Sequence, residues 1–441
     1  MGVFADLRRL LANREFRKLF AVRLVSQAGD GAFQVGLASV LFFSDTSTAR
    51  SAAAGFSVLF APFVVAPFVG VMLDRWLRRQ VLRNANAVRG LVTLGAAVAM
   101  FLGAPTWVLV GVGLLALAIN RFILSGLSAG MPTILGISAE PNEEQREFLL
   151  TANSVVPTMG TAATILGGGV GLLTSLFAPE GSIRDAAALT ISGALMIAAA
   201  ALAIRMTPTQ LGPEHPASTP LRSAIGEVFR DLGYGARYLA RRVTPGQGLL
   251  AMAFHRFIFG VVTIAAILMA NNLYNPGDSA GAIATFAMFM AMITAGGFLA
   301  VVITPFVSRA MGPQVWVAIM LGVAAVSQFA MALSYVQWLV WVCAFLLGLA
   351  AQAAKIAVDT IVAKDTHDEF RGRAFSFYDL LFNAAYTGAA VLAAFVVPDT
   401  GWSRPLFFVL AAAYAVGAFV MATFGARSPR EVDIESLVSA G

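Results

Sequence analysis

Apolar residues in this 441-residue chain gather into long runs that alternate with short polar segments. Each run is close to the length of about 20 residues that a helix needs to cross the hydrocarbon core of a bilayer. Inside lipid, only helices and closed barrels satisfy every backbone hydrogen-bonding group. The pattern therefore predicts an all-α membrane protein with twelve transmembrane helices. The predicted helices span residues 17–44, 51–73, 81–102, 106–131, 149–177, 184–206, 247–272, 279–308, 314–335, 337–361, 373–397 and 403–426.

The longest polar stretch, residues 207–246, lies midway and divides the predicted helices into two halves of six. We interpret the chain as an N-terminal bundle over 1–206, a cytoplasmic linker over 207–246, and a C-terminal bundle with a short tail over 247–441. Between Leu221 and Leu239 the linker places apolar and Arg residues at helical spacing, which predicts a basic amphipathic helix on the membrane surface. Such a helix fits a tether between the halves or a regulatory element, and the tether is the simpler interpretation.

Charged residues are few, and their placement indicates orientation. They make up 12% of the sequence, against about 25% in soluble proteins, while hydrophobic residues make up 58%. Most Lys and Arg residues fall in alternate loops, so the positive-inside rule places both termini in the cytoplasm. The same placement accounts for the net charge of +6 without nucleic acid as a partner. The single cysteine, Cys343, lies in an apolar run, so a disulfide framework is excluded.

The most distinctive polar loop lies between the second and third predicted helices, at positions 70–79. It reads Gly-Val-Met-Leu-Asp-Arg-Trp-Leu-Arg-Arg. This resembles the loop Gly-x-x-x-Asp-Arg-x-x-Arg-Arg/Lys between helices 2 and 3 of the major facilitator superfamily. The departure is Leu77, where that family usually has a small residue. The resemblance covers nearly the whole chain, and it implies the major facilitator fold and transport of a small molecule by alternating access.

The resemblance also implies a cytoplasmic gate. Asp74 is expected near the N-terminus of helix 11, where the helix dipole favours an anion. Nearby Arg residues are expected to pair with acids or with helix C-termini, and such contacts between the halves would favour the outward-facing state. Alternatively, Arg78 and Arg79 only anchor the loop in the cytoplasm. The predicted gate residues are Gly70, Asp74, Arg75, Arg78, Arg79, Arg371 and Arg373.

Further loops resemble one branch of this superfamily. The pair Arg146-Glu147 and the triplet Arg371-Gly372-Arg373, together with the segment Gly233–Leu239, are similar to corresponding segments of bacterial enterobactin exporters and macrolide efflux proteins. This resemblance implies efflux by a proton antiporter of a bacterial cytoplasmic membrane, with protons, a small-molecule substrate and lipids as partners, acting as a monomer. A nutrient or metal-ion facilitator remains an alternative within transport. A non-transporting receptor or a lipid scramblase on the same fold is an alternative outside it.

Ionisable residues within membrane spans are costly and usually functional. Asp30 lies near the middle of the first predicted span, where it could exchange a proton for substrate. It could instead form a structural pair with Arg23 or with an Arg of a neighbouring helix. The other candidates for proton coupling or substrate binding are Arg121, His255, Asp379 and Asn383. For His255 a structural hydrogen bond is an equal alternative, and for Asp379 a structural role is slightly favoured.

The balance of these charges bears on the substrate. Arg outnumbers Asp within the predicted spans, which favours an anionic or neutral amphiphilic substrate over a cationic one. Iron exporters of the superfamily place an acid and a His on helices 1 and 7, as Asp30 and His255 would be here. The sequence shows no dense cluster of metal ligands, so no metal site and no cofactor are predicted. No nucleophile triad or phosphate loop indicates an enzyme.

Glycines are concentrated in two of the predicted spans. Gly29 and Gly31 flank Asp30 in the first, and the run 167–171 contains four glycines in the fifth. Small residues let helix backbones approach closely in membranes. We therefore predict close packing of these helices, whereas the Gly-Pro pair typical of antiporters of the superfamily is absent from the fifth span. The pair Lys355 and Asp359, one turn apart, predicts an ion pair within one helix.

Overall fold

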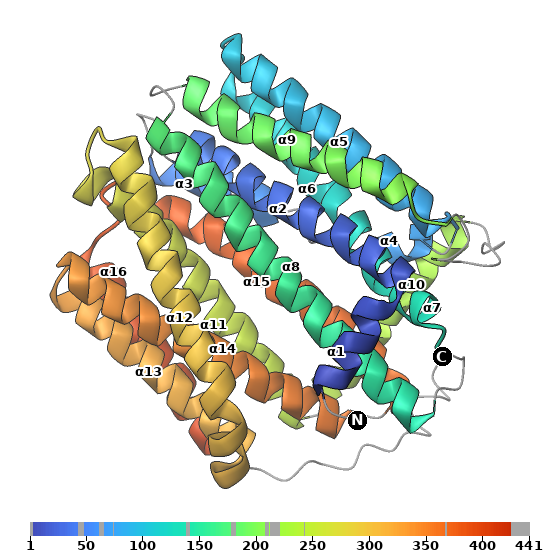
Figure 1. Ribbon diagram of the computed structural model, residues 1–441. Helices are drawn as coiled ribbons and strands as arrows, with labels where there is room; N and C mark the ends of the chain where they lie inside the picture. The colour runs from blue at the N-terminus through green and yellow to red at the C-terminus, as the bar shows by residue number, and fades with distance from the viewer. Residues whose placement is uncertain are drawn as a thin grey trace. The chain divides into compact units, whose positions relative to one another are not determined.

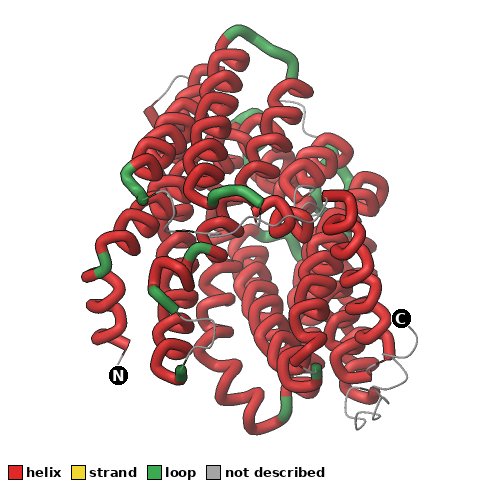
Figure 2. Tube along the Cα trace, turned by 90° about the vertical axis from the view of Figure 1, so that its right-hand side faces the viewer, coloured by secondary structure: helices red, strands yellow, loops and turns green. Residues whose placement is uncertain are grey.

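The computed structural model describes residues 3–42, 48–60, 66–73, 75–137, 142–177, 182–207, 211, 221–241, 243–366 and 368–424. Every regular element in these ranges is helical (Figure 2). The helices are α1 Val3–Ala12, α2 Arg14–Phe42, α3 Ala49–Phe60, α4 Ala66–Leu73, α5 Arg78–Phe101, α6 Thr106–Ala129, α7 Met131–Leu135, α8 Glu143–Phe177, α9 Ser182–Ile204, α10 Leu221–Arg241, α11 Val243–Leu268, η2 (a π-helical turn) Met269–Tyr274, α12 Ser279–Met311, α13 Pro313–Leu333, α14 Gln337–Asp365, α15 Asp368–Val396 and α16 Arg404–Phe424.

Nine helices within the described residues are long and apolar enough to cross a membrane. They correspond to the predicted spans from 106–131 onward. The earlier predicted spans correspond to α2, to α3 with α4, and to α5 (Figure 1). Charged side chains lower the hydropathy of two of these: Asp30 lies within α2 and Arg89 within α5. The span predicted at 51–73 is described as two helices, with residues 61–65 between them outside the described ranges.

The chain divides into two compact units. The first comprises residues 1–41 and 61–225, and the second comprises 42–60 and 226–441. Helix α3 groups with the second unit because it packs on α15 and α11. Phe56 of α3 sets its ring edge-on to Tyr386 of α15, with 4.7 Å between the ring centroids. The amphipathic helix expected in the linker is present as α10.

Close crossing of two helices organises the first unit. A Cβ atom built on Gly31 of α2 would lie 1.9 Å from the carbonyl oxygen of Thr164 in α8. A Cβ atom on Gly167 of α8 would lie 1.9 Å from the carbonyl oxygen of Ala28 in α2. Only glycine fits at either position, because the obstruction in each case is backbone. Close packing was predicted for each of these helices and is confirmed, and the structure shows that they pack on each other.

The start of α2 is fixed by a side-chain cap. Asn13 accepts hydrogen bonds through Oδ1 from the backbone N–H groups of Glu15 at 2.9 Å and Phe16 at 3.1 Å. These bonds satisfy two N–H groups that have no partner within the helix. Asn13 also donates from Nδ2 to the carbonyl of Ile134, in α7, at 3.2 Å. The cap therefore connects the first turn of α2 to a second helix of the same unit.

The second unit repeats the use of glycine at helix crossings. A Cβ atom on Gly296 of α12 would lie 2.0 Å from the carbonyl oxygen of Phe345 in α14, and one on Gly348 of α14 would lie 2.1 Å from that of Ile293. Gly260 of α11 faces α15 in the same way, where its Cβ atom would lie 2.5 Å from that of Ala389. Two helix pairs in this unit thus approach more closely than larger side chains would allow.

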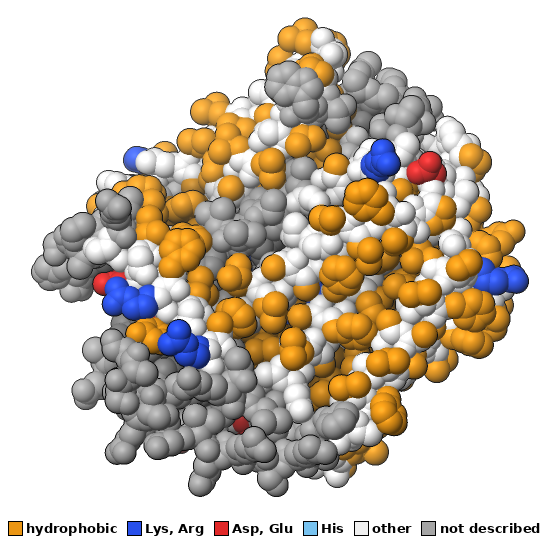
Figure 3. Space-filling view, turned by 180° about the vertical axis from the view of Figure 1, so that it is seen from behind, with side chains coloured by type: hydrophobic (Ala, Val, Ile, Leu, Met, Phe, Trp, Pro, Cys, Tyr) orange, Lys and Arg blue, Asp and Glu red, His pale blue; other side chains and the backbone are white. Residues whose placement is uncertain are grey.

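The outer surface is apolar over wide areas. Figure 3 shows hydrophobic side chains spread over one face, with charged side chains at only a few places among the described residues. On α12, Phe298 is 66% exposed, Val302 62% and Phe306 72%. A continuous apolar surface of this kind is unfavourable in water and suits contact with lipid chains. Much of the described surface is therefore suited to contact with the bilayer.

Candidate functional site

A buried ion pair lies inside the first unit. Asp30, on α2, accepts a hydrogen bond from the guanidinium of Arg89, on α5, and the side chains are 5% and 0% exposed, respectively. Arg89 also donates to Oδ1 of Asn120, on α6, at 3.1 Å. Three helices therefore meet at one charged network. Of the alternatives considered for Asp30, the structure shows pairing with an Arg of a neighbouring helix.

Other polar side chains surround this pair. Arg121 interacts electrostatically with both Asp30 and Arg89. Arg23, which also was a possible partner of Asp30, instead donates from Nε to Oε1 of Gln27 at 2.9 Å. A buried hydrogen bond of 2.7 Å joins Ser26 Oγ to Asn86 Oδ1, again between α2 and α5. The polar side chains of α2 thus follow one another along one face of the helix, namely Arg23, Ser26, Gln27 and Asp30.

The Asp30–Arg89 pair has an energetic consequence. Removing two charges from water costs several kcal/mol for each ion, and their attraction offsets this only when the geometry and the remaining hydrogen bonds are good. Asn120 supplies such a bond to Arg89. Without the Asp30 carboxylate, Arg89 would be left as a buried charge with one amide acceptor. The pair therefore contributes to the packing of α2 against α5.

Two of the predicted gate arginines contact helix C-termini. Arg78 donates to the carbonyl of Ala129, the last residue of α6, at 3.1 Å, and to that of Leu211 at 3.0 Å. Arg79 donates to the carbonyl of Ile204, the last residue of α9, at 2.7 Å. A cation at a helix C-terminus is stabilised by the helix dipole and by carbonyls that lack helical partners. Both contacts lie within the first unit.

The remaining gate residues are only partly described. Asp74 lies outside the described residues, and Gly70 lies in α4. Arg75 follows α4 and is partly buried. Arg371 and Arg373 lie in α15, but their side chains are outside what the structure describes. The gate therefore stays a prediction from the sequence.

Two adjacent residues of α11 carry the polar chemistry of the second unit. His255 is 1% exposed, and its Nδ1 lies 3.1 Å from the hydroxyl of Tyr414, on α16. Arg256 places its guanidinium 3.9 Å from the ring centroid of Tyr386 and 4.3 Å from that of Phe382, both on α15. The His255 contact is the structural hydrogen bond that was one of its two alternatives, while Arg256 was not singled out as a site residue.

Two predicted site residues, Asp379 and Asn383, lie in α15, close in sequence to Phe382 and Tyr386. Asp379 is exposed, and Asn383 donates from Nδ2 to the carbonyl of Asp379 at 2.7 Å. On α14, Lys355 and Asp359 form the predicted ion pair at 2.6 Å. Within the described residues, no group of three or more His, Cys, Asp or Glu side chains is arranged to hold a metal ion.

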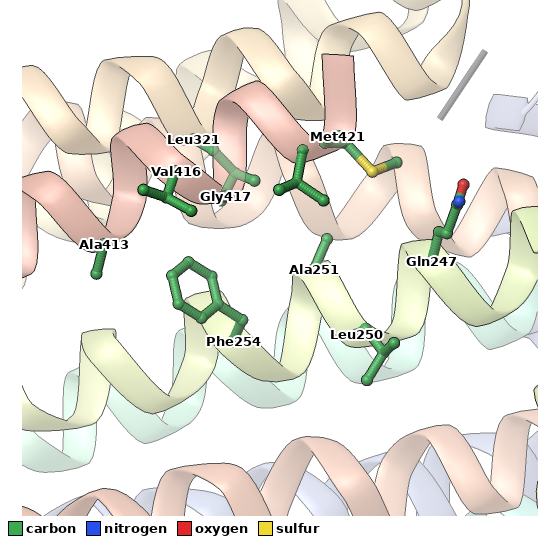
Figure 4. Close-up of a pocket in the computed structure, with 10 residues that line it drawn as sticks. Gln247, Leu250, Ala251, Phe254, Leu321, Ala413, Val416, Gly417 and Met421 are labelled. Atoms are coloured by element: carbon green, nitrogen blue, oxygen red, sulfur yellow. The ribbon is translucent and has the colours of Figure 1, made fainter. Parts of the chain in front are cut away.

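An apolar pocket of about 450 Å³ opens between α11, α13 and α16 (Figure 4). Figure 4 shows Phe254 of α11 pointing toward α16, where Gly417 leaves room for its ring. A Cβ atom on Gly417 would lie 2.8 Å from Cε1 of Phe254. Gln247, at one end, is the polar residue among those that line the pocket.

Sequence reasoning identified Asp30 but missed the partners that define its environment. An Arg of a neighbouring helix was one of the alternative partners of Asp30, but neither Arg89 nor Asn120 was singled out. The signal for these partners would have been a polar residue in one span that faces the Asp30 carboxylate of another span. Identifying such a residue requires knowing how each helix is rotated about its axis, and a run that is apolar on all faces does not reveal that rotation.

Apolar helices with charges paired inside them define the class of the protein, a polytopic helical membrane protein with a polar interior. Solved structures of transporters share this fold. The chain aligns with the nucleoside transporter NupG at a TM-score of 0.66 and 15% identity, covering 93% of this chain and 99% of that one. It aligns with a bacterial homologue of the iron transporter ferroportin at 0.67 and 15%, covering 93% and 98%. At this level of identity, the likeness shows the fold alone.

Sequence comparison supplies the family. The model of the Major Facilitator Superfamily matches residues 248–438. An uncharacterized MFS-type transporter of Mycobacterium tuberculosis is 32% identical over 422 residues, which cover 95% of this chain and 92% of the relative. An uncharacterized MFS-type transporter of Mycobacterium bovis matches to the same extent. The chain belongs to the major facilitator superfamily. It is a multi-pass secondary transporter and not an enzyme.

Proposed function

We propose that this protein is a proton-coupled exporter of a small anionic or neutral amphiphilic compound. It has twelve transmembrane helices with both termini in the cytoplasm, lies in a bacterial cytoplasmic membrane, and works as a monomer by alternating access. The observation that carries the proposal is the buried Asp30–Arg89 pair, because a titratable group in this position links proton binding to helix packing. The transport family supplies the general activity, and the pair supplies the coupling.

Coupling requires two states with different affinities for a proton. In the state described here, the Asp30 carboxylate is bound by Arg89. The proposal adds a second state, in which α2 and α5 separate at this level and the carboxylate is open to a proton. Rocking between the two states then takes up a proton on one side of the membrane and releases it on the other. Arg121 lies close enough to interact electrostatically with Asp30 and would respond to a change in the charge of its carboxylate.

The remaining site assignments complete the proposal. Arg121, His255, Asp379 and Asn383 are proposed to contribute to substrate or proton binding. The loop 70–79, with Arg371 and Arg373, is proposed as the cytoplasmic gate. Asp74→Asn is then expected to reduce transport while the protein still inserts into the membrane. Normal turnover by this variant would show that Asp74 is not a gate residue.

Proton flux in proteoliposomes with an internal pH dye tests the proposal. Wild-type protein is screened with anionic, neutral and cationic amphiphiles alongside Asp30→Asn and a control, Glu227→Gln, which changes an exposed carboxylate on α10. Substrate-dependent flux is expected in the wild type and the control but not in Asp30→Asn. Equal flux in Asp30→Asn would place the proton site elsewhere. Imposing the pH gradient in each direction separates export from uptake of a nutrient.

A further inference from the structure

Arg256 is held in an aromatic surround inside a membrane span. Its guanidinium carbon lies 3.9 Å from the ring centroid of Tyr386, 4.3 Å from that of Phe382 and 5.4 Å from that of Phe259. Two rings belong to α15, while Phe259 lies about one turn further along α11. Contact between a guanidinium and aromatic faces stabilises the positive charge, and more strongly where water is excluded. The rings therefore explain how the charge is tolerated in an apolar span.

Aromatic rings do not satisfy the hydrogen-bonding capacity of this side chain. A guanidinium has five N–H donors that point outward in its plane, whereas a ring stacked on its face accepts none of them in that plane. The Nε atom of Arg256 is buried and has no hydrogen-bond partner among the described residues. Unpartnered buried donors are costly, so an acceptor from outside the protein would be favourable here.

The carboxylates near this part of the second unit do not supply that acceptor. Asp359 is bound by Lys355 at 2.6 Å, and no ion pair links a described carboxylate to Arg256. Arg89 in the first unit is the contrasting case, because it has both Asp30 and Asn120 as acceptors. The side chain of Arg256 is partly exposed, so a ligand can reach it.

We propose that Arg256, Phe382 and Tyr386 form an anion-binding subsite that takes the oxyanion head of an amphiphile. The planar N–H fork of Arg256 matches a carboxylate or phosphate in a bidentate arrangement. The ring of Phe382, which is partly exposed, also offers apolar surface to the carbon atoms next to the head group. This inference rests on the proposed function and narrows its substrate class from anionic or neutral compounds to anions.

Two sources share this chemistry: a soluble carboxylate amphiphile and an anionic lipid head group. The chain offers its own reporter for binding, because Cys343 is its single cysteine and is 1% exposed, on α14 in the same unit as Arg256. A thiol-reactive dye labels Cys343 only when this unit unfolds. A ligand that binds the folded unit raises the temperature at which labelling begins.

The experiment compares 4-phenylbutyrate with its neutral amide, 4-phenylbutyramide, on protein in an uncharged detergent. Dose–response curves are recorded for the wild type, for Arg256→Gln and for a matched control, Arg309→Gln, which changes an exposed Arg of α12 in the same unit. The acid is expected to bind at least about tenfold more tightly than the amide in the wild type and the control, as charged hydrogen bonds usually confer. Arg256→Gln is expected to remove that preference.

Equal behaviour of acid and amide in the wild type, including no effect of either, would overturn the subsite, as would a preference that survives in Arg256→Gln. If Arg256→Gln does not fold, Arg256→Lys decides, because it keeps the charge without the planar fork and should lose most of the preference. Nanodiscs of phosphatidylcholine and of phosphatidylglycerol then separate the sources. Stabilisation by phosphatidylglycerol that depends on Arg256 assigns the subsite to a lipid head group. None of these readouts requires proton flux, so they stand apart from the test of Asp30.

Discussion

The crossing of α2 and α8 predicts opposite effects for one substitution at two neighbouring positions. A Cβ atom at Gly167 would lie 1.9, 2.5 and 2.7 Å from the carbonyl oxygen, carbonyl carbon and Cα of Ala28. Ordinary van der Waals contact begins at 3.4 Å, so the two backbones must separate by about 1.5 Å, the difference between 3.4 and 1.9 Å. No side-chain rotation relieves the clash, because all three atoms are backbone. At Gly169, by contrast, a Cβ atom would meet nothing within 4 Å.

The expected magnitudes follow from these distances. Overpacking of a well-packed interface costs about 1–3 kcal/mol, and Gly167→Ala should lie at the upper end because neither helix can yield locally. Gly169→Ala has no clash, and Ala favours a helix over Gly by up to about 1 kcal/mol, so it should be neutral or stabilising. For a unit of about 150–250 residues, each kcal/mol shifts the Tm by about 2–4 °C. Gly167→Ala should therefore lower the Tm by roughly 4–12 °C.

Circular dichroism at 222 nm during heating, on protein in an uncharged detergent, measures both variants against the wild type. The far-ultraviolet signal reports all helices and therefore includes the first unit. Labelling of the buried Cys343 would report only the second unit. Equal Tm values for Gly167→Ala and Gly169→Ala would refute the close backbone crossing. A fall of Tm in Gly169→Ala alone would show that α8 presents a different face to α2.

Three further predictions concern single contacts of the first unit. Asp30→Asn should cost about 3 kcal/mol of unfolding free energy because it leaves Arg89 buried without a carboxylate. Adding Arg89→Gln should recover most of that loss in a double-mutant cycle of thermal stabilities. Additive losses in the cycle would argue against the pair. Asn13→Ala should cost about 1 kcal/mol through loss of the cap of α2, as measured by thermal unfolding. Asn13→Asp keeps the cap but loses the hydrogen bond to Ile134, so its loss of stability should come from that bond alone. Arg79→Gln should cost about 0.5–1 kcal/mol by removing a cation from the C-terminus of α9, and unchanged substrate flux in that variant would assign Arg79 to anchoring rather than gating.

The sequence predicted those features that depend on local pattern. Helix α10 followed from polar and apolar spacing, and close packing of α2 and of α8 followed from Gly31 and from the glycine run at 167–171, although the sequence did not show that these two helices pack on each other. Both predictions depend on properties of a single segment, namely which helix face is apolar and where glycines leave the backbone without side chains. The ion pair of Lys355 with Asp359 was predictable for the same reason, because both residues lie on one helix face.

Features that depend on contacts between segments were not predictable. Asp30 had several arginines within plausible reach, and the choice of Arg89 over Arg23 depends on how α2 and α5 are rotated against each other. The aromatic surround of Arg256 requires Phe382 and Tyr386 to be brought from α15, more than 120 positions further along the chain. Apolar spans tolerate many rotations by hydropathy alone, so pairwise packing decides which polar groups meet.

The two arginines illustrate different solutions to one physical problem, and the difference separates their roles. Arg89 is neutralised by Asp30 and held by Asn120, so its environment is complete, and any change in the charge of Asp30 disturbs the packing of three helices. Arg256 is stabilised through its faces by aromatic rings, so its charge is retained without an internal carboxylate that a ligand would have to displace. The first arrangement suits coupling, and the second suits recognition. Substitution of Asp30 should therefore alter proton dependence with little effect on ligand preference, whereas substitution of Arg256 should alter ligand preference first.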